Sequence, residues 1–317
     1  MKKLLTAITI LLLLFASISI QTTDAKSETT PTLLLHGFMG SKSTFLHTAE
    51  VFQENKRGNF ERVYSVSPKG KIKVEKVNKP SKGKSPIIIV EFENNTASLA
   101  DQTKWLASVI KSVKSTYKVK HVNIVGHSMG GVTAINYILT NKLKGQDIKK
   151  LVTVDSPILG ANTEFFNQIQ TGLAQMVAYG VIEPNIYEDL QKAIETPAYH
   201  DLTSKLLESL ANNKKYKGKF PKHIKALSIS VKQSEVVSTS SAYGLKLYTN
   251  SKTKKNVTYK EMEYSGESIM DLLKDPLNAL KFAKGLKDLE EITSFTRHSG
   301  VLTLTETDEE LMSFLFK

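Results

Sequence analysis

Short apolar runs alternate with longer amphipathic segments along most of the chain. The runs typical of buried strands stand at residues 31–35, 86–92, 122–125, 150–154, 224–231 and 257–264. Segments with the pattern of a helix lie between them, at residues 43–53, 99–117 and 133–139. Residues 62–77 alternate apolar and charged side chains, which predicts a hairpin with one solvated face. Strands that alternate with helices predict an α/β fold with a mostly parallel central sheet flanked by helices.

Two helical segments interrupt this alternation. Residues 158–219 are mainly helical and contain no convincing strand, so we expect a helical cap insertion over the carboxyl edge of the sheet. A second helical insertion covers about residues 266–292. It is either a lid that guards an acyl chain or an amphipathic helix packed on the core, and we favour the packed helix. With both insertions included, residues 26–317 form a single domain.

The first 25 residues have the pattern of a secretory signal peptide. Lys2 and Lys3 precede an apolar run over residues 4–20, and a polar stretch ends at the small residue Ala25. A retained membrane anchor is the alternative, and the small residue favours cleavage. The chain has no cysteine, so neither disulfides nor lipid modification at cysteine is available. We expect a secreted protein that is extracellular or associated with the cell surface.

The chain is basic, with a net charge of +12, so partners with negative charge are considered first. Lysines concentrate at residues 69–84, 214–222 and 252–255. Neither interleaved aromatic residues nor a known nucleic-acid motif accompanies them, so we expect no nucleic-acid partner. Loose contact with an anionic cell envelope fits this charge better.

The stretch VNIVGHSMGG, from Val122 to Gly131, contains the first candidate catalytic residue. A G-x-S-x-G sequence between a strand and a helix is the nucleophile elbow of α/β-hydrolases. Gly126 and Gly130 supply the small residues that this sharp turn needs, and the start of the helix places free N–H groups near the serine. We therefore predict that Ser128 is the nucleophile.

A serine hydroxyl needs a base, an acid that orients the base, and donors for the oxyanion. In these sheets the order along the chain is serine, acid, histidine. Three histidines follow Ser128: His200 lies in the expected cap, His223 at the start of a strand, and His298 in a loop after the last strand. The base is expected in a loop after the last strand, so we predict that His298 is the base.

The oxyanion donors are expected to be two backbone N–H groups. One belongs to Met129, the residue after the nucleophile. The other lies in the glycine-containing loop after the strand at 31–35, where we choose Phe38. His36 in this loop is expected to shape the loop, not to act as a second base.

Cofactor motifs do not accompany these residues. The sequence has no HExxH or EF-hand pattern, and no phosphate loop or dinucleotide fingerprint. We therefore expect neither a metal nor another cofactor.

Several motifs in order resemble one known family. They are HGFMGSKSTF, PIIIVEFENN, the helix that contains Trp105, VNIVGHSMGG and the closing RHSG. Together they resemble a DUF915-like group of α/β-hydrolases of poorly defined function, found in Gram-positive bacteria and often labelled cell-surface hydrolases. The resemblance covers most of the chain after residue 25. It implies an α/β-hydrolase fold and an ester or acyl substrate, which we expect to be a small molecule or a lipid.

The sequence departs from this family at the acid. Members usually have an Asp-Gly-x-Val segment after the strand before last, and the usual aspartate and glycine align with Ser234 and Glu235 here. Glu235 is one candidate for the acid. Asp155, at the end of the preceding strand, is the alternative, and we prefer Glu235. A serine–histidine pair without an acid is the third interpretation.

These residues predict a serine hydrolase that cleaves carboxylic esters in the manner of an esterase or lipase. Two alternatives remain open. The same residues could serve amide cleavage or acyl transfer. A degenerate hydrolase could instead bind the cell envelope, although the combination of Ser128, His298 and the early glycine loop disfavours this.

Overall fold

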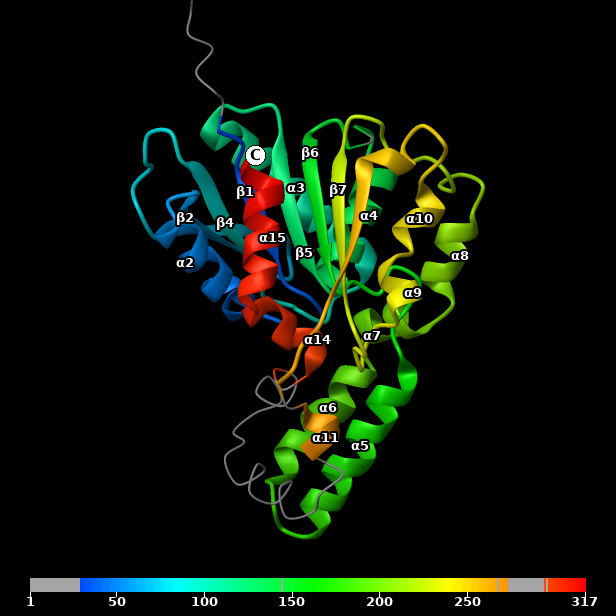
Figure 1. Cartoon of the computed structure of the whole chain (residues 1–317). Helices are drawn as coiled ribbons and strands as arrows, with labels where there is room; N and C mark the ends of the chain where they lie inside the picture. The colour runs from blue at the N-terminus through cyan, green and yellow to red at the C-terminus, as the bar shows by residue number, and fades with distance from the viewer. Residues whose placement is uncertain (1–28, 144, 267, 273–293, 295) are drawn as a thin grey trace, which may run out of the picture.

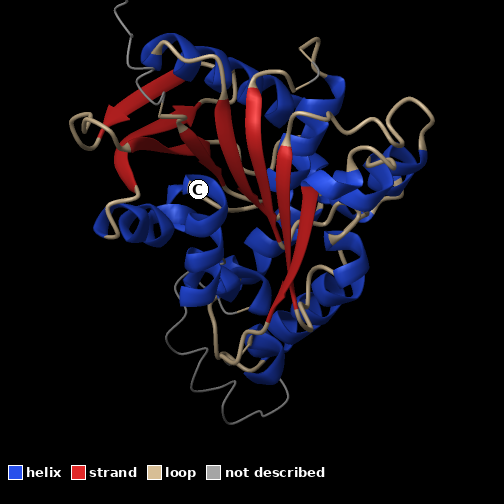
Figure 2. Ribbon diagram, turned by 45° about the horizontal axis from the view of Figure 1, so that its top comes forward, coloured by secondary structure: helices blue, strands red, loops and turns tan. Residues whose placement is uncertain are grey.

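Eight strands form one twisted sheet in the computed structural model (Figures 1 and 2). The structure describes residues 29–143, 145–266, 268–272, 294 and 296–317. The strands are β1 (Thr32–Leu35), β2 (Gly58–Val66), β3 (Ile72–Lys76), β4 (Ser85–Phe92), β5 (Val122–His127), β6 (Ile148–Val154), β7 (Lys225–Val231) and β8 (Val257–Met262). Their order is β3-β2-β4-β1-β5-β6-β7-β8, and all pairs are parallel except the β2–β3 hairpin. The predicted fold class is confirmed.

Alternate side chains of the central strands enter two separate cores. In β1, Leu33 and Leu35 pack on one face of the sheet and Leu34 packs on the other. This follows from the two-residue period of a strand. Because both faces are buried, these strands are continuously apolar, which is the pattern that the sequence shows.

Helices cover both faces of the sheet. The side chains of α3 (Leu99–Tyr117) and α4 (Met129–Thr140) pack on the Leu33 face together with α10 (Leu245–Tyr248). On the Leu34 face lie η1 (Lys42–Phe45), α2 (Leu46–Glu54) and α15 (Thr305–Phe316). Figure 1 shows α2 and α15 in front of the sheet, with α3 and α4 behind it.

Four helices lie between β6 and β7, in the segment expected to form the cap. They are α5 (Thr163–Ala178), α6 (Pro184–Ile194), α7 (Pro197–Thr203) and α8 (Leu206–Asn212). Figure 1 shows α5 and α6 beyond the end of the sheet at which β5, β6 and β7 finish. Their apolar faces form a cluster with Val236 and Val237 from the loop after β7. These helices therefore stand over the carboxyl edge of the sheet.

The remaining elements are short. They are α9 (Thr239–Ala242), η2 (Lys254–Asn256), α11 (Ile269–Leu272), α14 (Arg297–Gly300) and η3 (Val301–Thr303). His298 was expected in a loop and lies instead in the single turn of α14, where the side chain of Thr296 accepts a hydrogen bond from Ser299 N.

Two sequence predictions fall wholly or mostly outside the described residues. These are the signal peptide at 1–25 and most of the insertion at 266–292. In the part of the chain that is described, no helix is both long enough and apolar enough to cross a membrane.

Candidate active site

Ser128 lies at the sharp turn between β5 and α4. Its backbone has φ 52° and ψ −127°, a strained conformation for a residue with a side chain. It is also the N-cap of α4, so its side chain stands at the positive end of that helix. This is the conformation expected of the serine in a nucleophile elbow.

The glycines on either side of Ser128 allow this turn. A Cβ on Gly126 would lie 2.4 Å from the nitrogen of Gly131, and one on Gly130 would lie 2.3 Å from the carbonyl oxygen of Leu35. Both contacts are with backbone atoms, which cannot move aside as a flexible side chain can. The two positions therefore accept only glycine in this arrangement.

His298 is paired with Asp155, although the two lie 143 positions apart in the sequence. His298 Nδ1 lies 2.7 Å from Asp155 Oδ2, and the aspartate is fully buried at the end of β6. A carboxylate only accepts hydrogen bonds, so the imidazole donates through Nδ1–H and keeps Nε2 as an acceptor. His298 is thus held in the tautomer that a general base needs.

Two further donors hold the Asp155 carboxylate. The hydroxyl of Ser234 donates to Oδ2 at 2.6 Å, and the backbone N–H of Val231 donates to Oδ1 at 3.1 Å. The buried charge is therefore hydrogen-bonded from three sides, as a carboxylate removed from water requires.

Glu235, the acid that we preferred from the sequence, does not contact His298. Its carboxylate accepts hydrogen bonds from Arg297, one from Nη1 at 2.8 Å and one from the backbone N–H at 3.0 Å. The guanidinium also contacts Asp271 Oδ2 at 2.5 Å. Glu235 is thus paired with Arg297, and the carboxylate that contacts His298 belongs to the alternative candidate, Asp155.

His127 is a neighbour of His298 that the sequence did not indicate. Its ring centroid lies 4.6 Å from that of His298, and its Nε2–H donates to the backbone oxygen of His298 at 2.9 Å. Burial, and secondarily the nearby charge of His298, lowers the pKa of His127 to about 3. This imidazole therefore stays neutral and fixes the backbone of the base. It occupies a variable position of the G-x-S-x-G motif, which gives no sequence signal for that role.

The loop after β1 lies against the serine. A Cβ on Gly37 would be 2.6 Å from Ser128 Cβ, which shows how closely the loop approaches. His36 shapes this loop, as expected, because its Nε2 accepts the N–H of Phe92 at 2.9 Å and its Nδ1 donates to Gly37 O at 2.8 Å. Phe38 follows directly in this loop.

The two expected oxyanion donors come from this loop and from the helix start. Met129 is the first residue of α4, so its N–H has no acceptor inside the helix. Among the described residues, the N–H of Phe38 has no backbone acceptor either. Both residues thus leave a donor free on the segments that flank Ser128.

Ser128 and His298 line one cavity of about 420 Å³. This volume falls in the range of small-molecule sites. The described residues include no hydrogen bond to Ser128 Oγ. Catalytic hydrogen bonds in ligand-free enzymes often tighten only when substrate binds.

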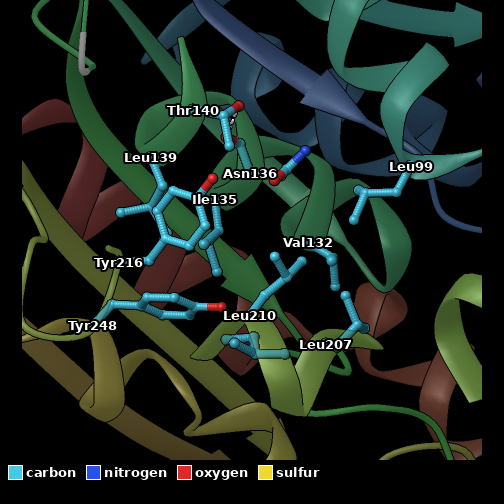
Figure 3. A pocket seen from close by; sticks show the side chains of 11 residues that line it. Leu99, Val132, Ile135, Asn136, Leu139, Thr140, Leu207, Leu210, Tyr216 and Tyr248 are labelled. Atoms are coloured by element: carbon cyan, nitrogen blue, oxygen red, sulfur yellow. Dashed lines mark hydrogen bonds between the residues drawn. The ribbon is translucent and has the colours of Figure 1, made fainter. Parts of the chain in front are cut away.

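Figure 3 shows a different, small cavity beside α4, lined by Leu99, Val132, Tyr216 and Tyr248 among others. Its volume of about 10 Å³ has room for about one water molecule. It is too small for a substrate, so the cavity at Ser128 is the candidate site.

No group of three or more histidine, aspartate or glutamate side chains in the described ranges could hold a metal ion.

The sheet order, the strained serine between β5 and α4, and the His298–Asp155 pair define an α/β-hydrolase. A family model described as an alpha/beta hydrolase of unknown function (DUF915) matches residues 19–196, more than half of the chain. The chain therefore belongs to this family, and the resemblance seen in the sequence is confirmed. No curated protein matches it.

Several solved structures are similar to the chain. The product of the gene lin2722 from Listeria innocua is 22% identical, covers 91% of this chain and 94% of its own, and has a TM-score of 0.57. A "putative cell surface hydrolase" from Lactobacillus plantarum is 14% identical over 90% and 98%, with a TM-score of 0.49. Naproxen esterase from Bacillus subtilis is 12% identical over 80% and 82%, with a TM-score of 0.42.

Proposed function

We propose that the protein is a secreted serine hydrolase that cleaves carboxylic esters. The observation that carries this proposal is the strained Ser128 in one cavity with His298, whose imidazole is oriented by Asp155. Ser128, Asp155 and His298 follow one another in the order serine, acid, histidine that is typical of α/β-hydrolases, with the acid after β6.

Each residue has a defined task in the first half of the reaction. Ser128 Oγ attacks the ester carbonyl carbon while His298 Nε2 takes the hydroxyl proton. Asp155 stabilises the imidazolium, and the N–H groups of Phe38 and Met129 bind the oxyanion. The bond to the alcohol oxygen then breaks, and His298 returns the proton to that oxygen. This leaves an acyl-enzyme on Ser128.

Water completes the cycle. His298 takes a proton from a water molecule that attacks the acyl carbonyl, and it then gives the proton to Ser128 Oγ as the carboxylic acid leaves. The Asp155–His298 contact supports an active enzyme over a degenerate hydrolase that only binds the cell envelope. Amide cleavage and acyl transfer would use the same groups with another leaving group or acceptor.

The activity is tested with p-nitrophenyl esters of increasing acyl length and with Ser128→Ala. We expect the wild-type protein to release p-nitrophenol and the variant to lose this activity by at least about 10³-fold. Ser209→Ala, at an exposed position of α8, is the matched control and should retain full activity. Equal turnover in Ser128→Ala and wild type would exclude a serine esterase at this site.

The secreted location is part of the proposal and rests on the pattern of residues 1–25. Expression of the full chain in a Gram-positive host should release a protein that begins at Lys26 into the medium. A lysine-rich exterior would allow loose contact with an anionic envelope, which high salt should release. Recovery of the full chain in the membrane fraction would indicate a retained anchor instead.

A further inference from the structure

The cavity at Ser128 has one apolar side, formed by the helices between β6 and β7. Phe165, Phe166 and Ile169 of α5 line it together with Leu190 of α6 and Leu202 of α7. Ile169 and Leu190 also belong to the buried cluster of α5 and α6. A chain of CH2 groups bound here would remove apolar surface from water on both partners.

Polar side chains form another part of the cavity lining, the polar side. Thr44 of η1 and His47 of α2 line it together with Thr303 of η3. Figure 1 shows that α2 lies against the face of the sheet, whereas α5 and α6 extend beyond the end of the sheet. The two linings therefore come from different parts of the fold, and Ser128 belongs to the cavity that both enclose.

His47 is held in place on this polar side. Its Nε2 lies 3.3 Å from Oδ2 of Asp308, which is buried on α15, and the His47 side chain is 53% exposed. A histidine oriented by a buried carboxylate presents its other ring nitrogen with a fixed direction. In the described residues, Nδ1 of His47 has no hydrogen-bond partner, so it is available to a ligand.

An ester carbonyl at Ser128 carries two substituents that leave it in different directions. If the acyl chain lies against α5 and α6, the alcohol portion lies toward His47 and Thr44. An apolar alcohol would bury these polar groups without partners, which costs free energy. An alcohol with further hydroxyl groups would pair with them.

We propose that the natural substrate is an ester of an apolar acyl chain with a polyol such as glycerol, with His47 as a determinant of specificity for the polyol. This inference rests on the ester hydrolase function proposed above. The apolar side selects the acyl chain. The Thr44–His47 side selects hydroxyl groups on the alcohol.

The test compares two esters with the same acyl chain and the same number of carbons in the alcohol, 1-monooctanoylglycerol and propyl octanoate. They differ only in the two free hydroxyl groups of the glycerol. We expect kcat/KM for the glycerol ester to be about tenfold higher or more. This difference corresponds to the free energy of about one hydrogen bond. His47→Leu should lower that ratio about tenfold, and His47→Gln, which keeps a hydrogen-bonding group, should restore part of it.

His121→Leu is the matched control, because His121 is exposed and precedes β5 at the end of the strand away from Ser128. It should leave the ratio unchanged. Two results would overturn this inference and leave the ester hydrolase proposal intact. One is hydrolysis of propyl octanoate with no preference for the glycerol ester. The other is an equal ratio in His47→Leu and wild type. Hydrolysis of neither ester would overturn both proposals.

Discussion

Asp155 Oδ2 lies 2.7 Å from His298 Nδ1, and the same oxygen accepts the hydroxyl of Ser234 at 2.6 Å. The carboxylate that contacts His298 therefore stands at the end of β6, and the loop after β7 donates a hydroxyl to it. In the resemblance described above, the usual aspartate aligns with Ser234, and the Ser234 hydroxyl here holds a carboxylate from the neighbouring strand β6.

Asp155→Asn should abolish most of the activity without unfolding the protein. The amide would favour the wrong tautomer of His298 and could not stabilise the imidazolium, and in a well-studied serine protease this change costs about 10⁴ in kcat. Steady-state kinetics on p-nitrophenyl butyrate, with a thermal melt to verify folding, measures the effect.

Glu235→Gln is the matched control for this prediction. It removes a carboxylate that contacts Arg297 and leaves the Asp155–His298 pair in place. Its loss in kcat should stay below about tenfold, because Arg297 acts on His298 only through the backbone. A larger loss in Glu235→Gln than in Asp155→Asn would restore Glu235 as the acid.

Ser234→Ala should lower kcat while KM changes little. The substitution removes one of three donors to a buried carboxylate, and a hydrogen bond to a charged group contributes about 1.5–3 kcal/mol. We expect a loss in kcat of about 10-fold to 100-fold as Asp155 loses its fixed orientation.

Ser234→Thr keeps the hydroxyl and separates positioning from packing. It should recover most of the lost kcat. If Ala and Thr at this position lower kcat equally, then Ser234 does not act through its hydroxyl.

Most of the fold and the sharp turn at Ser128 could be predicted because their signals are local. The strand, the two glycines and the helix around Ser128 lie within about 20 residues of one another. The apolar runs also predicted β4, β6 and β7, since strands buried on both faces need no partner to be recognised.

The pairing of His298 with Asp155 could not be predicted because it is a long-range contact. Both Asp155 and Glu235 follow a strand at the same edge of the sheet, so spacing does not separate them. The choice depends on Arg297, which pairs with Glu235 from 62 positions away. His127 was missed for a similar reason, since its contact is with a residue 171 positions later.

Ile169→Trp should shift the acyl preference toward shorter chains. Ile169 is buried and lines the apolar side of the cavity, so the larger ring would fill space that a long acyl chain needs. Each methylene excluded from such a pocket changes specificity by about 10-fold or more. The ratio of kcat/KM for p-nitrophenyl decanoate to that for the acetate should fall at least about tenfold.

Gln168→Trp places the same side chain on the exposed side of α5 and serves as the control. Its decanoate-to-acetate ratio should equal that of the wild type. A shift of equal size in both variants would mean that α5 does not bind the acyl chain.

Asp308→Asn should stabilise the protein increasingly as the pH rises from 4 to 7. Burial raises the pKa of Asp308 to about 6 from its ordinary value of 3.8, and the nearby His47 opposes this only in part. A carboxyl whose pKa is raised by folding favours the folded state when protonated, so its contribution is complete below about pH 4 and is lost as the pH passes through 6. The asparagine does not titrate. The Tm of Asp308→Asn should therefore rise relative to the wild-type Tm as the pH increases across this window. The rise is on the order of 2–4 °C for each kcal/mol of stability that the wild-type carboxyl loses.

Glu309→Gln, at an exposed position of the same helix, should show a constant difference from wild type. A difference between Asp308→Asn and wild type that is equally constant from pH 4 to 7 would contradict the raised pKa.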